Sequence, residues 1–174
     1  ARHAARQTVS SVLQVEVQNA VDTLNKPAAR LLVRGAQDTL RLDEVEVLLA
    51  SEAFVVDACR HTVRDASATV SLATRPVLFA LLRMLAEAWP QDVPRERLLA
   101  GAFRAREADE SYRARLRVEI GRLRAELRGL AEVRATPQGF VLKPCRAEQV
   151  AVLTPLAEEP HAGVLALLAD GMGG

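Results

Sequence analysis

Helical periodicity is clearest in the segment 113–128, which reads RARLRVEIGRLRAELR. Successive residues of a helix are turned by about 100°, so one narrow apolar face holds Leu116, Ile120, Leu123 and Leu127. The opposite face is thin, because it carries only the small or medium side chains of Ala114, Val118, Gly121 and Ala125. We therefore predict a helix over residues 111–128 with one buried face, and we expect Leu123 to lie in the core.

The residues around this helix predict an α+β domain over residues 53–146. Short β-branched segments between residues 54 and 72, separated by polar turns, predict an antiparallel meander. Thr74-Arg75-Pro76 opens a helix that ends before Pro90, with Thr74 as its N-cap; its expected buried stripe is Val77, Leu81, Met84 or Leu85, and Trp89. A shorter helix starts at Val93-Pro94, and residues 133–135 and 140–142 form a hairpin.

The segments that flank this domain are predicted to be helical. Residues 8–24 carry apolar side chains at helical spacing and end at Asn25-Lys26-Pro27; a short apolar segment, 28–33, and a helix over 43–51 follow. Residues 1–52 are expected to be a helical connector, a dimerisation segment or the remainder of a larger domain. Residues 147–174 are expected to form a C-terminal helical appendage, split at Glu158-Glu159-Pro160. Its second piece either packs on the domain or opens a further helix-turn-helix.

Charge is unevenly distributed along the chain, although the formal net charge is only +1. Residues 53–146 carry 17 basic and 11 acidic side chains, whereas both flanks are acidic on balance. A basic central segment favours a polyanionic partner. A helix with a thin face edged by guanidinium groups fits the major groove of DNA, which is about 12 Å wide. The alternative is a solvated surface helix held by i,i+4 ion pairs.

The order of meander, helix, helix, helix and hairpin resembles the effector domain of the OmpR/PhoB family of bacterial transcription regulators, a winged helix-turn-helix. The resemblance covers residues from about Phe54 to Lys143, half of the chain. It is carried by VSLATRPVLFALLRML in the first helix, VPRERLLAGAF in the second, LRVEIGRLRAEL in the recognition helix and ATPQGFVL in the wing. Its sharpest points are Arg122-Leu123-Arg124 and Gly139-Phe140. The slot where the family wing carries an arginine falls near Thr136.

The resemblance implies a sequence-specific DNA-binding regulator with helix 111–128 in the major groove. The wing, residues 133–143, would then lie on the DNA backbone or in the minor groove. Arg113, Arg115 and Arg117 are expected to reach base edges or flanking phosphates. Arg122 and Arg124 are expected either to bind phosphate or to support the fold through ion pairs with Glu119 or Glu126 and contacts with the meander.

The wing supplies two further candidate contacts to the DNA backbone, Arg134 and Lys143. The implied partners are double-stranded DNA, a second copy of the chain and RNA polymerase. The alternative to a DNA-binding regulator is a winged-helix interaction module, whose basic face docks on an acidic protein surface without reading DNA.

Enzymatic, metal-binding and membrane classes find little support in the residues. Cys59 and His61 would share one face of a strand, so that a contact between them is possible. A histidine that is hydrogen-bonded within the fold or faces solvent is nevertheless favoured over a catalytic one. Neither a glycine-rich phosphate loop nor a Cys-x-x-Cys pair is present, so no enzyme, metal or cofactor is expected. Two cysteines are too few for a disulfide scaffold. With no apolar run near the roughly 20 residues that span a bilayer, a cytoplasmic protein is expected.

Overall fold

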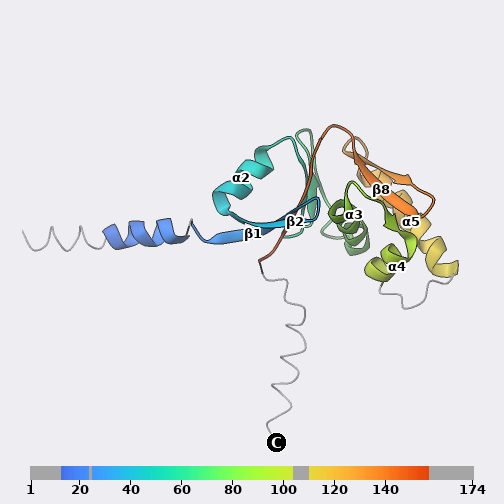
Figure 1. Cartoon of the computed structure of the whole chain (residues 1–174), viewed down its shortest axis with the longest axis horizontal. Helices are drawn as coiled ribbons and strands as arrows, with labels where there is room; N and C mark the ends of the chain where they lie inside the picture. Colours follow the sequence, from blue (N-terminus) through green and yellow to red (C-terminus); the bar gives the residue numbers. More distant parts are fainter. Residues whose placement is uncertain (1–12, 24, 104–109, 157–174) are drawn as a thin grey trace, which may run out of the picture.

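The computed structural model describes residues 13–23, 25–103 and 110–156 (Figure 1). The predicted helix over 8–24 therefore lies partly outside the described residues. The second piece of the C-terminal appendage lies wholly outside them.

A six-stranded sheet forms the centre of the structure, with the strand order β2-β1-β9-β3-β4-β5. Its strands are β1 (Pro27–Val33), β2 (Ala36–Arg41), β3 (Phe54–Asp57), β4 (Thr62–Arg64), β5 (Thr69–Ser71) and β9 (Val150–Thr154). Strands β3 and β9 pair in parallel, and the other neighbours are antiparallel. The chain must therefore cross the domain between β3 and β9, and between them it forms β4, β5, three helices and the three strands of a second sheet.

The central strands β3 and β9 are buried on both faces, which explains their continuous apolar sequences. On one face, Val55 and Leu153 pack under helix α2 (Leu42–Ala50). On the other face, Phe54 and Val56 join the larger core beneath helix α3 (Pro76–Ala88). The result is a layered arrangement in which α2 and α3 lie on opposite sides of the sheet (Figure 1).

Beyond α3, the chain builds the half of the molecule that carries the predicted recognition helix. Strand β6 (Val93–Pro94) leads into α4 (Arg95–Phe103), and α5 (Glu110–Glu126) precedes the hairpin of β7 (Ala131–Ala135) and β8 (Gly139–Pro144). These strands form a second sheet in the order β6-β8-β7. Side chains from α3, α4, α5 and this sheet share one core with the large sheet.

The α+β class and the order of elements between residues 54 and 144 are confirmed. The meander, the three helices, the hairpin and the helix over 43–51 all form close to their predicted bounds. Leu123 is completely buried, as predicted. The predicted cap of α3 is wrong by one residue, because Arg75 occupies the N-cap position without a side-chain cap and Pro76 takes the first turn.

The buried stripe of α3 is wider than the sequence pattern predicts. Leu81 and Leu85 are buried as expected, whereas Val77 and Trp89 are only half-buried. The additional buried residues are Leu78, Phe79, Leu82 and Ala86. The reason is that α3 contacts the sheet on one side and α4 and α5 on others, so a single apolar stripe does not describe it.

Two flanking segments predicted to be helical are strands instead, which corrects the expected all-helical character of residues 1–52 and 147–174. Residues 27–41 form the hairpin β1–β2, and residues 150–154 form β9 between β1 and β3. Short apolar runs do not distinguish a buried strand from a helix, and here long-range pairing decides between them. The sheet consequently runs continuously across both expected domain boundaries.

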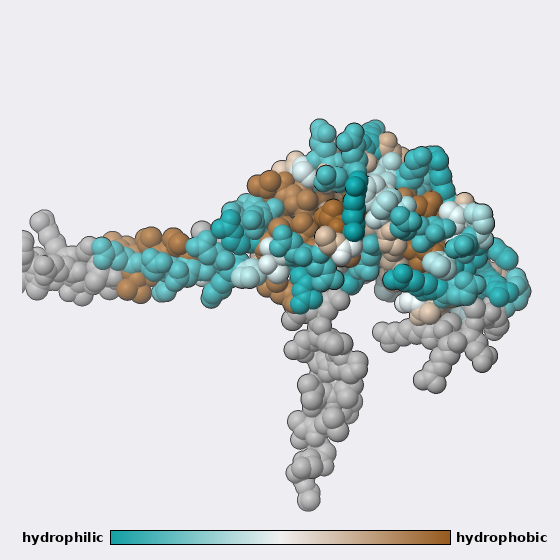
Figure 2. All heavy atoms as spheres, viewed as in Figure 1, coloured by the Kyte–Doolittle hydropathy of each residue, from teal (hydrophilic) through white to brown (hydrophobic). Residues whose placement is uncertain are grey.

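A helix over residues 13–23 precedes β1 and extends away from the sheet (Figure 1). Every one of its residues is exposed, including Leu13, Val15, Val17 and Val21, which expose 42–62% of their surface. Figure 2 shows hydrophobic residues along this helix, with no other described segment covering them. The described part of this helix therefore does not pack on its own domain.

Candidate nucleic-acid interface

Helix α5 presents the predicted thin face to solvent. Ala114, Val118, Gly121 and Ala125 are all exposed, and Val118 exposes 53% of its surface. The opposite face is buried through Leu116, Ile120, Leu123 and Leu127. No neighbouring atom lies within 4 Å of the position that a Cβ would take at Gly121. The outer face of α5 is therefore open enough for the helix backbone to approach a flat or concave surface closely.

One flank of α5 begins with two loosely held arginines. The carboxylate of Glu110 forms ion pairs with both arginines, at 3.8 Å from Arg113 Nη1 and 3.4 Å from Arg117 Nη2. All three side chains are more than half exposed. Exposed ion pairs of this kind are worth roughly 0–1 kcal/mol. Both guanidinium groups are consequently free to exchange Glu110 for an external anion at little cost.

The same flank ends against the hairpin. Arg124 Nε donates a hydrogen bond to the carbonyl oxygen of Val133 in β7 at 2.8 Å. Arg134, one residue further along β7, pairs with Glu132 at 2.6 Å. Lys143 lies opposite Glu132 in the β7–β8 register and is exposed. Arg124 therefore supports the hairpin, while Arg134 and Lys143 project from it around one carboxylate.

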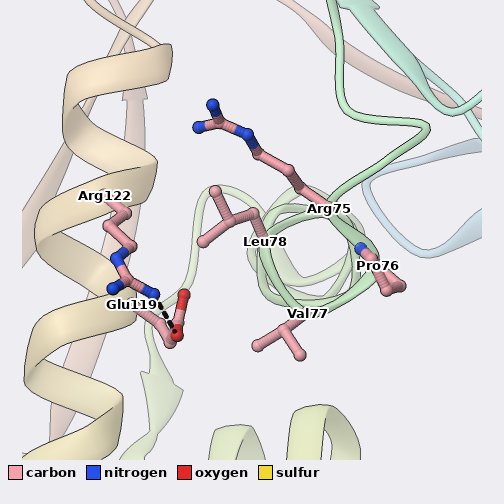
Figure 3. A pocket seen from close by; sticks show the side chains of 6 residues that line it. All are labelled: Arg75, Pro76, Val77, Leu78, Glu119 and Arg122. Carbon is pink, nitrogen blue, oxygen red and sulfur yellow. Dashed lines mark hydrogen bonds and ion pairs between the residues drawn. The ribbon is translucent and has the colours of Figure 1, made fainter.

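The other flank of α5 faces α3 and α4. The Arg115 guanidinium lies 4.8 Å from the centre of the Phe103 ring in α4. Arg122 Nη1 donates to Glu119 Oε1 at 2.9 Å, and Figure 3 shows this pair beside the start of α3. The expected ion pair between Arg122 and Glu119 is thus confirmed. Arg124, in contrast, pairs with neither Glu119 nor Glu126.

A surface cavity of about 470 Å³ lies where this flank meets α3 (Figure 3). Its lining comprises Arg75, Pro76, Val77, Leu78, Glu119 and Arg122. The Arg75 guanidinium forms an ion pair with Glu126, one of the two carboxylates expected to pair with Arg122 or Arg124. Arg75 was missed because 51 residues separate it from Glu126 along the chain, and no local pattern links them.

The turn of the hairpin is held by Arg95, a residue that the sequence analysis also missed. Its two terminal nitrogens donate to the carbonyl oxygens of Thr136 and Pro137 at 3.1 and 3.0 Å. Its guanidinium carbon also lies 5.3 Å from the centre of the Phe140 ring. The Thr136 hydroxyl donates to Asp92 Oδ2 at 2.6 Å. These contacts connect the turn to the first residue of α4 and to Asp92, just before β6.

Cys59 and His61, in the turn between β3 and β4, and Cys145, just after β8, show no arrangement for nucleophilic chemistry. Partial burial, and then the neighbouring Asp57 carboxylate, raise the pKa of the Cys59 thiol. A nucleophilic cysteine instead needs a lowered pKa. The His61 ring packs edge-on against Phe79 with ring centres 4.7 Å apart. Cys59 and Cys145 are both free and exposed.

The described residues contain neither a candidate metal-binding cluster nor a candidate membrane-spanning helix. Within residues 13–23, 25–103 and 110–156, no group of three or more His, Cys, Asp or Glu side chains could hold a metal ion. None of the helices in this part of the chain combines the length and apolar character needed to cross a membrane.

Comparison with known proteins adds no relative. The chain matches no protein-family model, and no curated protein is significantly similar to it in sequence. Interpretation of the surface therefore depends on its geometry and charge.

Proposed function

We propose that residues 54–144 form a winged helix-turn-helix of the OmpR/PhoB type, and that the protein is a bacterial transcription regulator that binds double-stranded DNA sequence-specifically. Helix α5 would lie in the major groove, and the β7–β8 hairpin would serve as the wing on the backbone or in the minor groove. The single observation that carries this proposal is the outer face of α5, which is thin, exposed and bordered by arginines on both flanks. The protein would act in the cytoplasm.

The dimensions of α5 support this placement. An α-helix with its side chains measures roughly 10–12 Å across, and the major groove is about 12 Å wide. A face built from Ala114, Val118, Gly121 and Ala125 allows the helix to enter without large side chains striking the groove floor. Arg113 and Arg117, held only by the exposed Glu110, are then the side chains best placed to exchange partners for guanine edges or phosphates.

The hairpin supports the same orientation. Arg95 and Asp92 hold its turn against α4, so the hairpin does not need to be ordered at the moment of binding. Preorganisation of this kind reduces the entropic cost of association. Arg134 and Lys143 project from the hairpin as the proposed backbone contacts.

A second copy of the chain is the proposed protein partner, bound through the helix over residues 13–23. Leu13, Val17, Ala20 and Val21 lie within about 100° of one another around this helix, and all are exposed. Pairing of two such helices would cover these apolar side chains. It would also link two DNA-binding units, which raises their effective concentration on paired half-sites. RNA polymerase remains a proposed further partner on the resemblance to the family alone.

The test uses two matched substitutions of exposed valines in helices. Val118→Glu places a carboxylate on the outer face of α5, and Val47→Glu places one on α2, where the valine exposes 72% of its surface. Binding to a pool of random-sequence duplexes is measured by fluorescence anisotropy at several salt concentrations, and preferred sites are then selected from the pool. We expect Val118→Glu to weaken binding at least tenfold and Val47→Glu to leave it unchanged.

Two results would contradict the proposal. The first is a folded wild-type protein that binds no duplex even at low salt, which would favour the interaction-module alternative. The second is an equal loss of affinity for both valine variants, which would show that the face of α5 is not the contact surface.

A further inference from the structure

A second basic cavity, of about 380 Å³, lies between the end of α5 and the outer edge of β7. The cavity is lined by Arg124, Arg128, Gly129, Ala131, Glu132, Val133, Arg134 and Cys145. An adjoining cavity of about 320 Å³ shares Glu132, Arg134 and Cys145 and adds Lys143 to the lining. The two hollows together place three guanidinium groups and one ammonium group around a single carboxylate.

The arginines of the larger cavity differ in whether their guanidinium groups already have a partner within the protein. Arg124 uses Nε to hold Val133, and Arg134 pairs with Glu132. Arg128 is exposed, and its side chain makes no hydrogen bond or ion pair with any residue in the described part of the chain. An uncompensated guanidinium beside two anchored ones is suited to an oxyanion, because its planar array of donors matches a phosphate or carboxylate in a bidentate manner.

The position of Arg128 just beyond the end of α5 favours a phosphate group of the nucleic-acid backbone. Arg117 and Arg124 fall on the same flank of the helix at 100° per residue, and Arg128 follows in the turn just after α5 ends at Glu126. Arg128 lies 11 residues beyond Arg117 in the chain and lines the same cavity as Arg124. Because the thin face of α5 would point to the groove floor, the flanks of the helix would face the groove walls, which the sugar–phosphate backbones form. With α5 in the groove, Arg128 therefore stands beside the sugar–phosphate backbone.

We infer that the cavity between α5 and β7 is a phosphate-binding site with Arg128 as its principal ligand, and that it receives a backbone phosphate of the bound DNA. The inference rests on the proposed function and adds to it a contact that the sequence pattern does not indicate. Arg124 holds the cavity wall in place through Val133, and Arg134 contributes the opposite side. The same oxyanion chemistry would accept a free phosphate compound, so the test includes both sources.

The first arm of the test measures salt dependence. Each phosphate neutralised by the protein contributes about 0.9 to the slope of log affinity against log salt. Arg128→Ala should lower this slope by about that amount, and Arg128→Lys, which keeps the charge, should preserve it. The matched control is Arg30→Ala, an exposed arginine of β1 outside the α5–hairpin half, which should leave the slope unchanged.

The second arm uses the two exposed cysteines as reporters in the same molecule. Cys145 lines both cavities, whereas Cys59 lies in the turn between β3 and β4. Alkylation by iodoacetamide is followed by mass spectrometry with no addition, with duplex DNA or with inorganic pyrophosphate. DNA should slow alkylation of Cys145 severalfold and leave Cys59 unaffected, and Arg128→Ala should reduce this protection.

The outcomes separate this inference from the proposed function. If the wild-type protein binds DNA while Arg128→Ala changes neither the slope nor the protection of Cys145, the cavity is not a phosphate site and the proposed function stands. If the folded wild-type protein binds no duplex, the proposed function fails, and the pyrophosphate arm then decides. Protection of Cys145 by pyrophosphate that Arg128→Ala abolishes would support a site for free phosphate compounds, and a lack of protection would overturn the inference.

Discussion

The substitution Leu123→Ala tests whether the apolar face of α5 holds the domain together. Leu123 has no exposed surface, and it lies in the core shared by α3, α5 and the β7–β8 hairpin. Replacing a buried leucine by alanine removes apolar contacts and leaves a cavity, at a usual cost of about 2–5 kcal/mol. Because rigid elements enclose the site on several sides, the structure has little room to collapse around the cavity. We therefore expect a loss in the upper part of that range, about 3–5 kcal/mol.

Such a loss is large compared with the stability of a typical domain, roughly 5–15 kcal/mol. With a urea dependence of roughly 2 kcal/mol per molar, the unfolding midpoint should fall by about 1.5–2.5 M. Urea unfolding followed by circular dichroism at 222 nm measures this change. The matched control is Val118→Ala on the same helix, which removes an exposed side chain and should change stability by no more than about 0.5 kcal/mol.

Equal midpoints for Leu123→Ala and Val118→Ala would refute the reasoning. In that case the apolar face of α5 would not be the face that packs on the domain. The assignment of the opposite face to DNA would lose its structural basis as well, because the two faces are defined by one helical pattern.

Two further predictions concern the hairpin and the N-terminal helix. Gly139→Ala should lower the melting temperature, because an added Cβ would overlap the carbonyl oxygen of Val93. Gly121→Ala should instead stabilise α5 by about 1 kcal/mol, because a Cβ at this position has open space around it. Equal melting temperatures for the two variants would contradict the close contact between β8 and β6. Val17→Glu should dissociate a dimer formed through the helix over residues 13–23, and Val15→Glu on its opposite face should not. Sedimentation at micromolar concentrations compares them, and a monomeric wild type would show that self-association is wrong.

The local sequence pattern determined α5 and its two faces. A repeat of apolar residues every three or four positions fixes which side of a helix is buried, because the helix geometry is the same wherever the helix lies. Leu123 is accordingly buried and Val118 exposed, as the pattern predicts. The meander and hairpin could be predicted from local sequence as well, because short turns with characteristic residues join neighbouring antiparallel strands. The six arginines of residues 113–128 were visible as a charge pattern.

The partners of the arginines were decided by the tertiary structure. Arg95 holds the turn of the hairpin from 41 and 42 residues away, and Arg75 pairs with Glu126 across 51 residues. Arg124 bonds to a backbone carbonyl of β7 rather than to an acidic side chain. Side-chain spacing along one helix does not show which carbonyl or carboxylate the fold will bring beside it. The basic cavity at Arg128 was likewise decided by the tertiary structure, because its walls come from both α5 and β7.

The sequence by itself therefore determined the periodic elements and the basic character of residues 53–146, because these depend on near neighbours in the chain. The strand identity of residues 27–41 and 150–154 depended on the tertiary structure. Strand β9 is a strand because it lies between β1 and β3, and it pairs in parallel with β3, almost 100 residues earlier. An apolar run of five residues suits a helix or a strand equally well until its neighbours are known, and only the folded sheet supplies those neighbours.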